Sequence, residues 1–238
     1  MNKIILTISF VCIQVLLIGQ GGNDGANFGG GSAWSSQSLG TRLFVDGLDG
    51  KFTSDKLYSD TKGSPYLTDE PVNGILVLNE SNRISDVPFQ IDLFTKEIII
   101  TDRQGNEHFL NKEFCHGFII PVDGKELHFS KLNSKQPDQF YELLFDNGVM
   151  KFFKERYVTR KDAVKNGVNN TPAKFKNRVK YFIDYGDGET IEVKLNEKNI
   201  LSGFSRHDKV KLKKYIKTSG LNLKDESDFI QLFNDFSS

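Results

Sequence analysis

The sequence contains very little cysteine, and this excludes a fold held together by disulfides. Only Cys12 and Cys115 occur among 238 residues. Cys12 lies in an apolar N-terminal segment that we expect to be removed, so Cys115 has no partner within the mature chain. A lipoprotein signal needs a small residue before its cysteine, whereas Val11 stands there. We therefore expect no lipid anchor, and stability has to come from the hydrophobic core.

The chain also lacks net charge, because 31 Lys and Arg balance 31 Asp and Glu. Nucleic acids and anionic membranes attract clustered cations, so we expect neither as a partner. Cations do cluster locally at 174–180 and 209–217. We interpret each cluster as the solvated face of a strand or a helix.

Familiar catalytic and ligand-binding motifs are missing as well. The sequence contains no nucleophile elbow, zinc-protease motif or phosphate-binding loop. Asp46 and Asp49 are three residues apart rather than two, and no Glu closes a calcium loop of about twelve residues, so a turn is expected there. Acidic residues are too numerous to select a glycosidase pair without geometry. No catalytic, cofactor-binding or metal-binding residue and no cofactor is predicted.

Cys115 and His128 flank a turn at 123–124 and raise the question of a metal site. Pairing Val122 with Lys125 across this turn places Cys115 and His128 on the same face of the hairpin. They are then four residues apart along the strand, which is about 13 Å. Ligands of one ion cannot be that far apart, so a metal site is not expected.

Cys115 and His116 are adjacent, which invites comparison with a thiol nucleophile and its base. Neighbouring residues of a strand point to opposite faces of the sheet, so these two side chains should not meet. We expect His116 to be buried, with its polar atoms hydrogen-bonded to the backbone.

The N-terminus has the pattern of a secretory signal peptide. Lys3 is followed by an almost unbroken apolar run at 4–18 and then by small and polar residues. The run is shorter than the roughly 20 apolar residues of a membrane-spanning helix. We expect residues 1–20 to be cleaved, the protein to be exported to the periplasm, the outer surface or the medium, and the mature chain to have no transmembrane segment.

Residues 21–40 are dominated by Gly, Ser and Asn and predict a flexible segment. This segment contains Trp34, the one tryptophan of the chain. We expect Trp34 to pack onto the first strands as a lid, the alternative being a surface anchor for a ligand or partner.

Residues 41–195 predict a β-rich domain built of hairpins. Turns combining Gly with Asp or Asn lie between apolar runs, at 123–124, 147–148, 186–188 and, more weakly, 102–106. A two-residue loop in the second of these turns places Phe145 opposite Met150. A three-residue loop in the third places Ile183 opposite Ile191, and Gly188 suits the left-handed position of that turn.

Residues 196–238 predict a C-terminal helical subdomain of two or three short helices. Asn196 is a candidate cap for the first, Gly220 can end the second, and acids at 225–228 suit the start of the third. The fold class is thus α+β, mainly an antiparallel sheet followed by helices. We expect the helices to pack together, or on the end of the sheet, through one apolar cluster: Val210, Leu212, Ile216, Phe229, Ile230, Phe233 and Phe236.

Several segments taken in order resemble a broad group of uncharacterised secreted proteins of Bacteroidetes-type bacteria. The matching segments are KGSPYL at 62–67, PFQIDL at 88–93, YELLFDNGVMK at 141–151 and the ending at 212–236. Phe89-Gln90-Ile91 departs from the Arg-Tyr-Asn core of the group. The resemblance covers roughly 60–236 and implies a location in the cell envelope or outside the cell. It brings no activity, ligand or catalytic residue with it.

These observations favour an exported envelope or extracellular protein without catalysis, a binding or scaffold module whose partner is unknown. Two alternatives stay open. One is a secreted hydrolase whose carboxylates come together only in the fold, which a cleft with paired acids would indicate. The other is a carrier of an apolar ligand, which an open apolar cavity would indicate.

Overall fold

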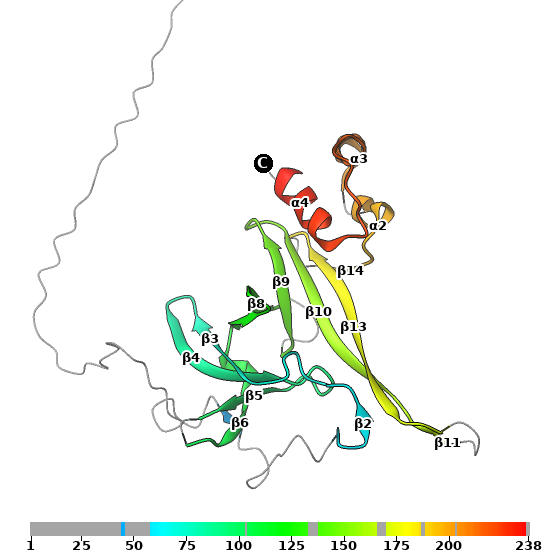
Figure 1. The fold of residues 1–238 in the computed structure, drawn as a ribbon. Coiled ribbons are helices and arrows are strands. Elements are labelled where there is room, and N and C mark those ends of the chain that lie inside the picture. The colour runs from blue at the N-terminus through cyan, green and yellow to red at the C-terminus, as the bar shows by residue number, and fades with distance from the viewer. Residues whose placement is uncertain are drawn as a thin grey trace, which may run out of the picture. The chain divides into compact units, whose positions relative to one another are not determined.

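Figure 1 shows a computed structural model of the chain, which divides into two units, residues 1–31 and 32–238. All residues that the structure describes lie in the second unit: 44–45, 58–102, 104–132, 138–165, 170–186, 189–202 and 204–236. The expectations for the signal peptide, for Trp34 and for the turn at Asp46 and Asp49 fall outside the described residues.

Twelve of the described strands form one sheet, in the order β1-β6-β5-β4-β3-β7-β8-β9-β10-β13-β14, with β2 paired to β13. The strands of this sheet are β1 (Phe44–Val45), β2 (Thr61–Lys62), β3 (Val72–Asn79), β4 (Asn82–Ile91), β5 (Ile98–Thr101), β6 (Glu107–Leu110), β7 (Gly117–Val122), β8 (Lys125–Lys131), β9 (Phe140–Asp146), β10 (Lys151–Lys161), β13 (Ala173–Asp184) and β14 (Thr190–Val193). Every pairing is antiparallel except that of β2 with β13. The order follows the chain closely because most neighbours are joined as hairpins.

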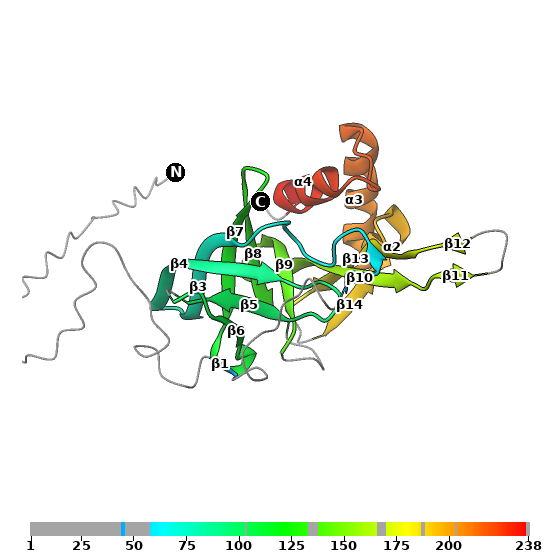
Figure 2. The same ribbon diagram turned by 60° about the horizontal axis from the view of Figure 1, so that its bottom comes forward.

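β10 and β13 are the longest strands and pair along eleven consecutive positions, from Lys151 with Asp184 to Lys161 with Lys174. A second, two-stranded sheet of β11 (Val164–Lys165) and β12 (Asn170–Thr171) lies between them in the chain. Figures 1 and 2 show the long pair leading away from the helices toward this tip. We call the outer part of the pair, residues 155–161 and 173–180, the ribbon.

The β7–β8 hairpin has the expected register. Val122 pairs with Lys125. Asp123 and Gly124 have φ of 50° and 74°, as a turn with two left-handed central residues requires. The β13–β14 register is confirmed too, because Ile183 pairs with Ile191; Gly188 lies outside the described residues.

The expected register of the β9–β10 hairpin is wrong. Phe145 pairs with Phe152 rather than with Met150. The loop is longer because the side chain of Asn147 accepts a hydrogen bond from the Met150 N–H at 2.7 Å, which closes a wider turn. After Phe152 a β-bulge shifts the pairing, and the apolar side chains of this hairpin are divided between two clusters.

Three α-helices follow the sheet, which together with it confirms the α+β class. The described helices are the one-turn η1 (Lys112–Phe114), α2 (Glu197–Ser202), α3 (Arg206–Ser219) and α4 (Glu226–Phe236). The Asn196 side chain accepts from the Asn199 N–H at 3.0 Å and caps α2, and Gly220, with φ of 68°, ends α3. Asp225 accepts from the Ser227 N–H at 2.8 Å and caps α4.

The helices and the inner ends of β9, β10, β13 and β14 share one hydrophobic cluster. Phe152 stacks on Phe229 with ring centroids 4.6 Å apart, and Phe145 stacks on Phe233 at 5.6 Å. The expected cluster is therefore confirmed for Leu212, Ile216, Phe229, Ile230 and Phe233. Val210 is a correction, because 67% of it is exposed. The side chain of Phe236 lies outside the described part.

A second cluster fills the space enclosed by β3 to β8. Phe118 stacks between Phe89 and Phe129, with ring centroids 5.4 Å and 4.6 Å away. Strands β7 and β8 approach closely at Gly117, where a Cβ atom would lie 2.3 Å from the Phe129 carbonyl oxygen. Only glycine allows that contact.

None of the helices in the described segments combines the length and the apolar character that crossing a membrane would require.

Candidate functional site

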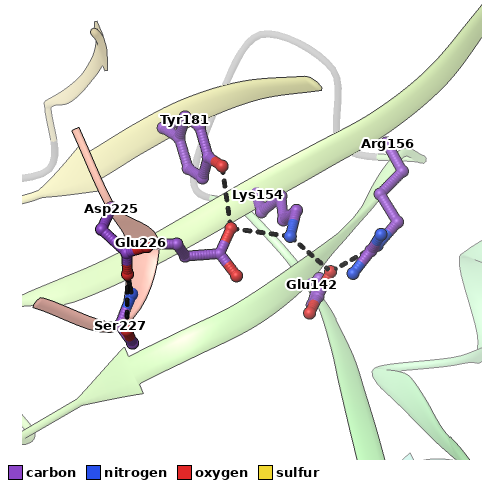
Figure 3. A network of polar contacts seen from close by, with 7 residues as sticks. All are labelled: Glu142, Lys154, Arg156, Tyr181, Asp225, Glu226 and Ser227. Atoms are coloured by element: carbon purple, nitrogen blue, oxygen red, sulfur yellow. Dashed lines mark hydrogen bonds and ion pairs between the residues drawn. The ribbon is translucent and has the colours of Figure 1, made fainter. Parts of the chain in front are cut away.

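A partly buried network of charges joins helix α4 to the sheet (Figure 3). Lys154 Nζ on β10 lies 2.6 Å from Glu226 Oε2 in the first turn of α4. Tyr181 on β13 donates its hydroxyl to the same oxygen at 2.8 Å. On the other side, Arg156 Nε donates at 2.6 Å to Glu142 Oε2, which lies 4.0 Å from Lys154 Nζ. Two carboxylates and two cations therefore neutralise one another.

This network holds α4 against the sheet, and each of its charged groups is engaged by another member of the network. The side chains of Lys154 and Glu142 are only 9% and 5% exposed, so each charge depends on its partner. Burial and the hydrogen bond to Glu226 raise the pKa of Tyr181 and keep its hydroxyl protonated as a donor.

Cys115 is buried, and its thiol is not activated. Its Sγ donates to the carbonyl oxygen of Gly117 at 3.0 Å. Burial raises the pKa of Cys115 to about 12, whereas a nucleophilic cysteine needs a lowered pKa. His116 is exposed, so the expectation that it is buried is wrong. Strand β7 begins only at Gly117, and before it the chain turns Cys115 inward and His116 outward.

The remaining histidines lie apart from one another in the fold. His108 Nε2 lies 3.1 Å from Asp102 Oδ2, and His128 is exposed, 3.9 Å from a carboxylate oxygen of Glu126. His207 is exposed on α3. Among the described residues, no group of three or more His, Cys, Asp or Glu side chains is close enough together to hold a metal ion.

Two hollows of the surface each contain a single carboxylate. A hollow of about 40 Å³ beside Phe118 includes Asp92. The carboxylate of Asp92 already accepts hydrogen bonds from the Tyr58 hydroxyl at 2.6 Å and from the Phe94 N–H at 2.8 Å. The hollow has room for a water molecule or two. A wider one of about 650 Å³ between α2 and α3 includes Glu197. Neither brings together the pair of carboxylates that glycoside hydrolysis uses.

Cations gather on one face of the ribbon. Lys174, Lys176, Arg178 and Lys180 occupy alternate positions of β13 and therefore share a face. The distance from the first to the last is about 20 Å at 3.3 Å per residue. The register adds Lys161 of β10 opposite Lys174.

Strand β2 brings a further cation to this face from far away in the sequence. Lys62 pairs with Lys174 on the side of β13 away from β10, so Lys62, Lys174 and Lys161 stand in a row across three neighbouring strands. Like charges at such positions repel each other. We define the basic face by its five exposed cations: Lys62, Lys161, Lys174, Lys176 and Arg178.

None of the five cations of the basic face forms an ion pair with another described residue. Lys180 at its inner end is paired with Glu192 at 3.5 Å. Glu155, the acid that β10 places on this face, is bound by Lys96 Nζ and Gln139 Nε2, each at 2.7 Å. On the opposite face of the ribbon the cation does have an acidic partner, because Arg160 is paired with Asp60 at 3.0 Å.

The basic face can hold a chain of negative charges whose spacing follows the strand. The sequence shows the cluster at 174–180, where it predicts an ordinary solvated face. The alternation of Lys and Arg in KFKNRVK at 174–180 was the available signal. Lys62 carried no signal of its own, because only the fold places it beside Lys174.

No family model matches this chain, and neither the curated proteins nor the solved structures contain a match to it.

Proposed function

We propose that the protein is an exported, non-catalytic binding module of the cell envelope or exterior, and that its basic face binds an acidic polysaccharide. The observation that carries this proposal is the row Lys62, Lys174, Lys161, three cations on adjacent strands without an acidic partner among the described residues. Repulsion between like charges on neighbouring strands lowers the stability of the fold, and a bound polyanion would relieve that repulsion.

The charge distribution favours a polymer over a small anion. The cations of β13 lie along a line of about 20 Å, and the surface between them is a strand rather than a hollow. A ligand that contacts them together has to be extended and to carry repeated charges. The N-terminal pattern predicts export, and outside the cell polymers of acidic sugars are extended ligands with repeated negative charges.

Binding of polygalacturonate, which has one carboxylate per sugar, tests the proposal. Its methyl ester has the same backbone without the charge and is the matched control ligand. We expect the native chain to bind the acid and not the ester, and the affinity to fall steeply as salt is added. The variant K174A/K176A should lose at least about tenfold in affinity, whereas K211A/K214A, with the same change in net charge on α3, should stay within about twofold.

Equal loss in the two variants would mean that only net charge matters and would refute the basic face as the site. Tighter binding of single-stranded DNA than of polygalacturonate would refute the choice of polymer. The export part is tested by N-terminal sequencing of the protein from its native cells. A mature chain that begins near residue 21 supports export, and a retained Met1 contradicts it.

A further inference from the structure

The groove between α2 and α3 is a second surface feature, besides the basic face, that packing of the core does not require. Its volume is about 650 Å³ and it is open to solvent, within the size range of ligand sites. Its lining includes Lys198, Leu201, Arg206, Lys209, Val210 and Lys213. The first two belong to α2 and the others to α3.

The groove combines an apolar floor with an apolar side chain that has no partner in the core. Leu201 is 6% exposed and forms the floor, whereas Val210 on the opposite wall is 67% exposed. On α3, Arg206, Lys209 and Lys213 follow the spacing i, i+3 and i+7, so that they share one side of the helix with Val210. The face along 206–213 is about 10 Å long.

The charge of the groove is strongly unbalanced. Lys198, Arg206, Lys209 and Lys213 contribute four positive charges, and Glu197 contributes one negative charge, which leaves +3. None of the four cations forms an ion pair with a residue in the part of the chain that the structure describes. A fitting occupant therefore brings acidic groups on both sides of an apolar group.

We propose that this groove docks an acidic, amphipathic peptide segment of a partner protein. An apolar side chain of the segment rests on Leu201 and against Val210, and its carboxylates meet Lys198 on one wall and Lys209 and Lys213 on the other. Two turns of helix or a short extended segment fit the length of the face. A sugar polymer supplies the charge but lacks the apolar group, so the apolar floor distinguishes this groove from the basic face of the ribbon.

The probe for this site is a short fluorescein-labelled peptide in which leucines are flanked by glutamates. One control peptide has glutamine in place of every glutamate, and another has serine in place of every leucine. We expect the full chain to bind the first peptide in the micromolar range and each control at least about tenfold more weakly. Equal binding of the serine peptide would overturn the proposal, because charge alone would then explain the binding.

Two charge-matched variants locate the peptide. K209E/K213E reverses two cations of the groove, and K211E/K214E reverses two exposed lysines of α3 outside it. The first should lose at least about tenfold in peptide affinity and the second less than about threefold. V210A, which keeps every charge, should also weaken binding. Similar losses in both charge variants would overturn the proposal.

Two further outcomes would name a different occupant. Displacement of the peptide by polygalacturonate would assign the groove to the polysaccharide. A concentration-dependent dimer in sedimentation that K209E/K213E abolishes would assign it to a second copy of the chain. Either outcome overturns the proposal. The ribbon variant K174A/K176A should bind the peptide with unchanged affinity, so the failure of this site and of the ribbon site are separate results.

Discussion

Replacing Glu226 by glutamine tests the network that fastens α4 to the sheet. The substitution keeps the size of the side chain and removes its charge. Lys154 Nζ, now 2.6 Å from Glu226, then keeps only Glu142 at 4.0 Å, and that carboxylate is already bonded to Arg156. A lysine whose side chain is 9% exposed is left without a close counter-charge.

The cost follows from the burial of the pair. Breaking a fully buried ion pair by removing one partner costs roughly 3–5 kcal/mol. The Glu226 side chain is 30% exposed, so solvent screens part of its interaction and we expect about 2–4 kcal/mol in the free energy of unfolding. For a chain of this size the melting temperature should fall by about 4–16 °C.

Urea and thermal unfolding of E226Q, followed by circular dichroism, measure this loss. E80Q makes the same chemical change at an exposed carboxylate in the β3–β4 turn and should melt like the native chain. Adding K154M to E226Q removes the unpaired charge and should restore part of the lost stability. If E226Q and E80Q melt at the same temperature, the network does not hold α4 to the sheet.

Three further predictions concern stability. Phe233 is 1% exposed, stacks on Phe145 and contacts the rings of Phe152 and Phe229, so F233A should cost about 3–5 kcal/mol. K213A on the exposed face should change little, and small effects of both substitutions would mean that the helices are loosely attached. The pKa of Cys115 is raised to about 12, so the folded thiol stays neutral at pH values where the unfolded thiol ionises. Above about pH 8.5 this group should therefore lower the free energy of unfolding by about 1.4 kcal/mol per pH unit. C115A should flatten the pH profile measured by urea unfolding, and an unchanged profile would contradict this. Burial opposes ionisation of Asp102, but hydrogen bonds from Asn106 and His108 lower its pKa. Its contribution to the free energy of unfolding is therefore present above about pH 3.9 and is lost as the pH falls through the lower pKa of the folded state. D102N should be less stable than the native chain at pH 7 and should lose less stability on acidification, and an equal loss in both proteins would refute this prediction.

The hairpins could be predicted because their turn chemistry is local. The turn at Asp123 and Gly124 needs two left-handed residues, and the sequence supplies them in place. The β9–β10 hairpin could not be predicted in register. The side chain of Asn147 widens its loop, and a bulge after Phe152 shifts the pairing. The widened loop rests on a side-chain hydrogen bond that competes with the two-residue turn, and the bulge lies beside Phe152, which packs against Phe229 of α4.

The sites were harder to predict because each depends on neighbours distant in the chain. The row of lysines on the ribbon exists only because a two-residue strand carries Lys62 to the side of Lys174. Val210 fits a helical apolar stripe in the sequence, but α3 is rotated so that Leu212 and Ile216 are buried and Val210 lines the groove. Periodicity identifies the helix and its apolar residues, and tertiary packing decides which of them stay exposed.

The basic face is tested most directly by the accessibility of its lysines in the presence of the ligand. Brief acetylation of the native chain, with and without polygalacturonate, followed by mass spectrometry reports each lysine separately. We expect Lys62, Lys161, Lys174 and Lys176 to be protected together, whereas Lys211 and Lys214 on α3 should react as before. Protection spread evenly over all exposed lysines, or confined to the helices, would contradict the assignment of the ribbon as the binding surface.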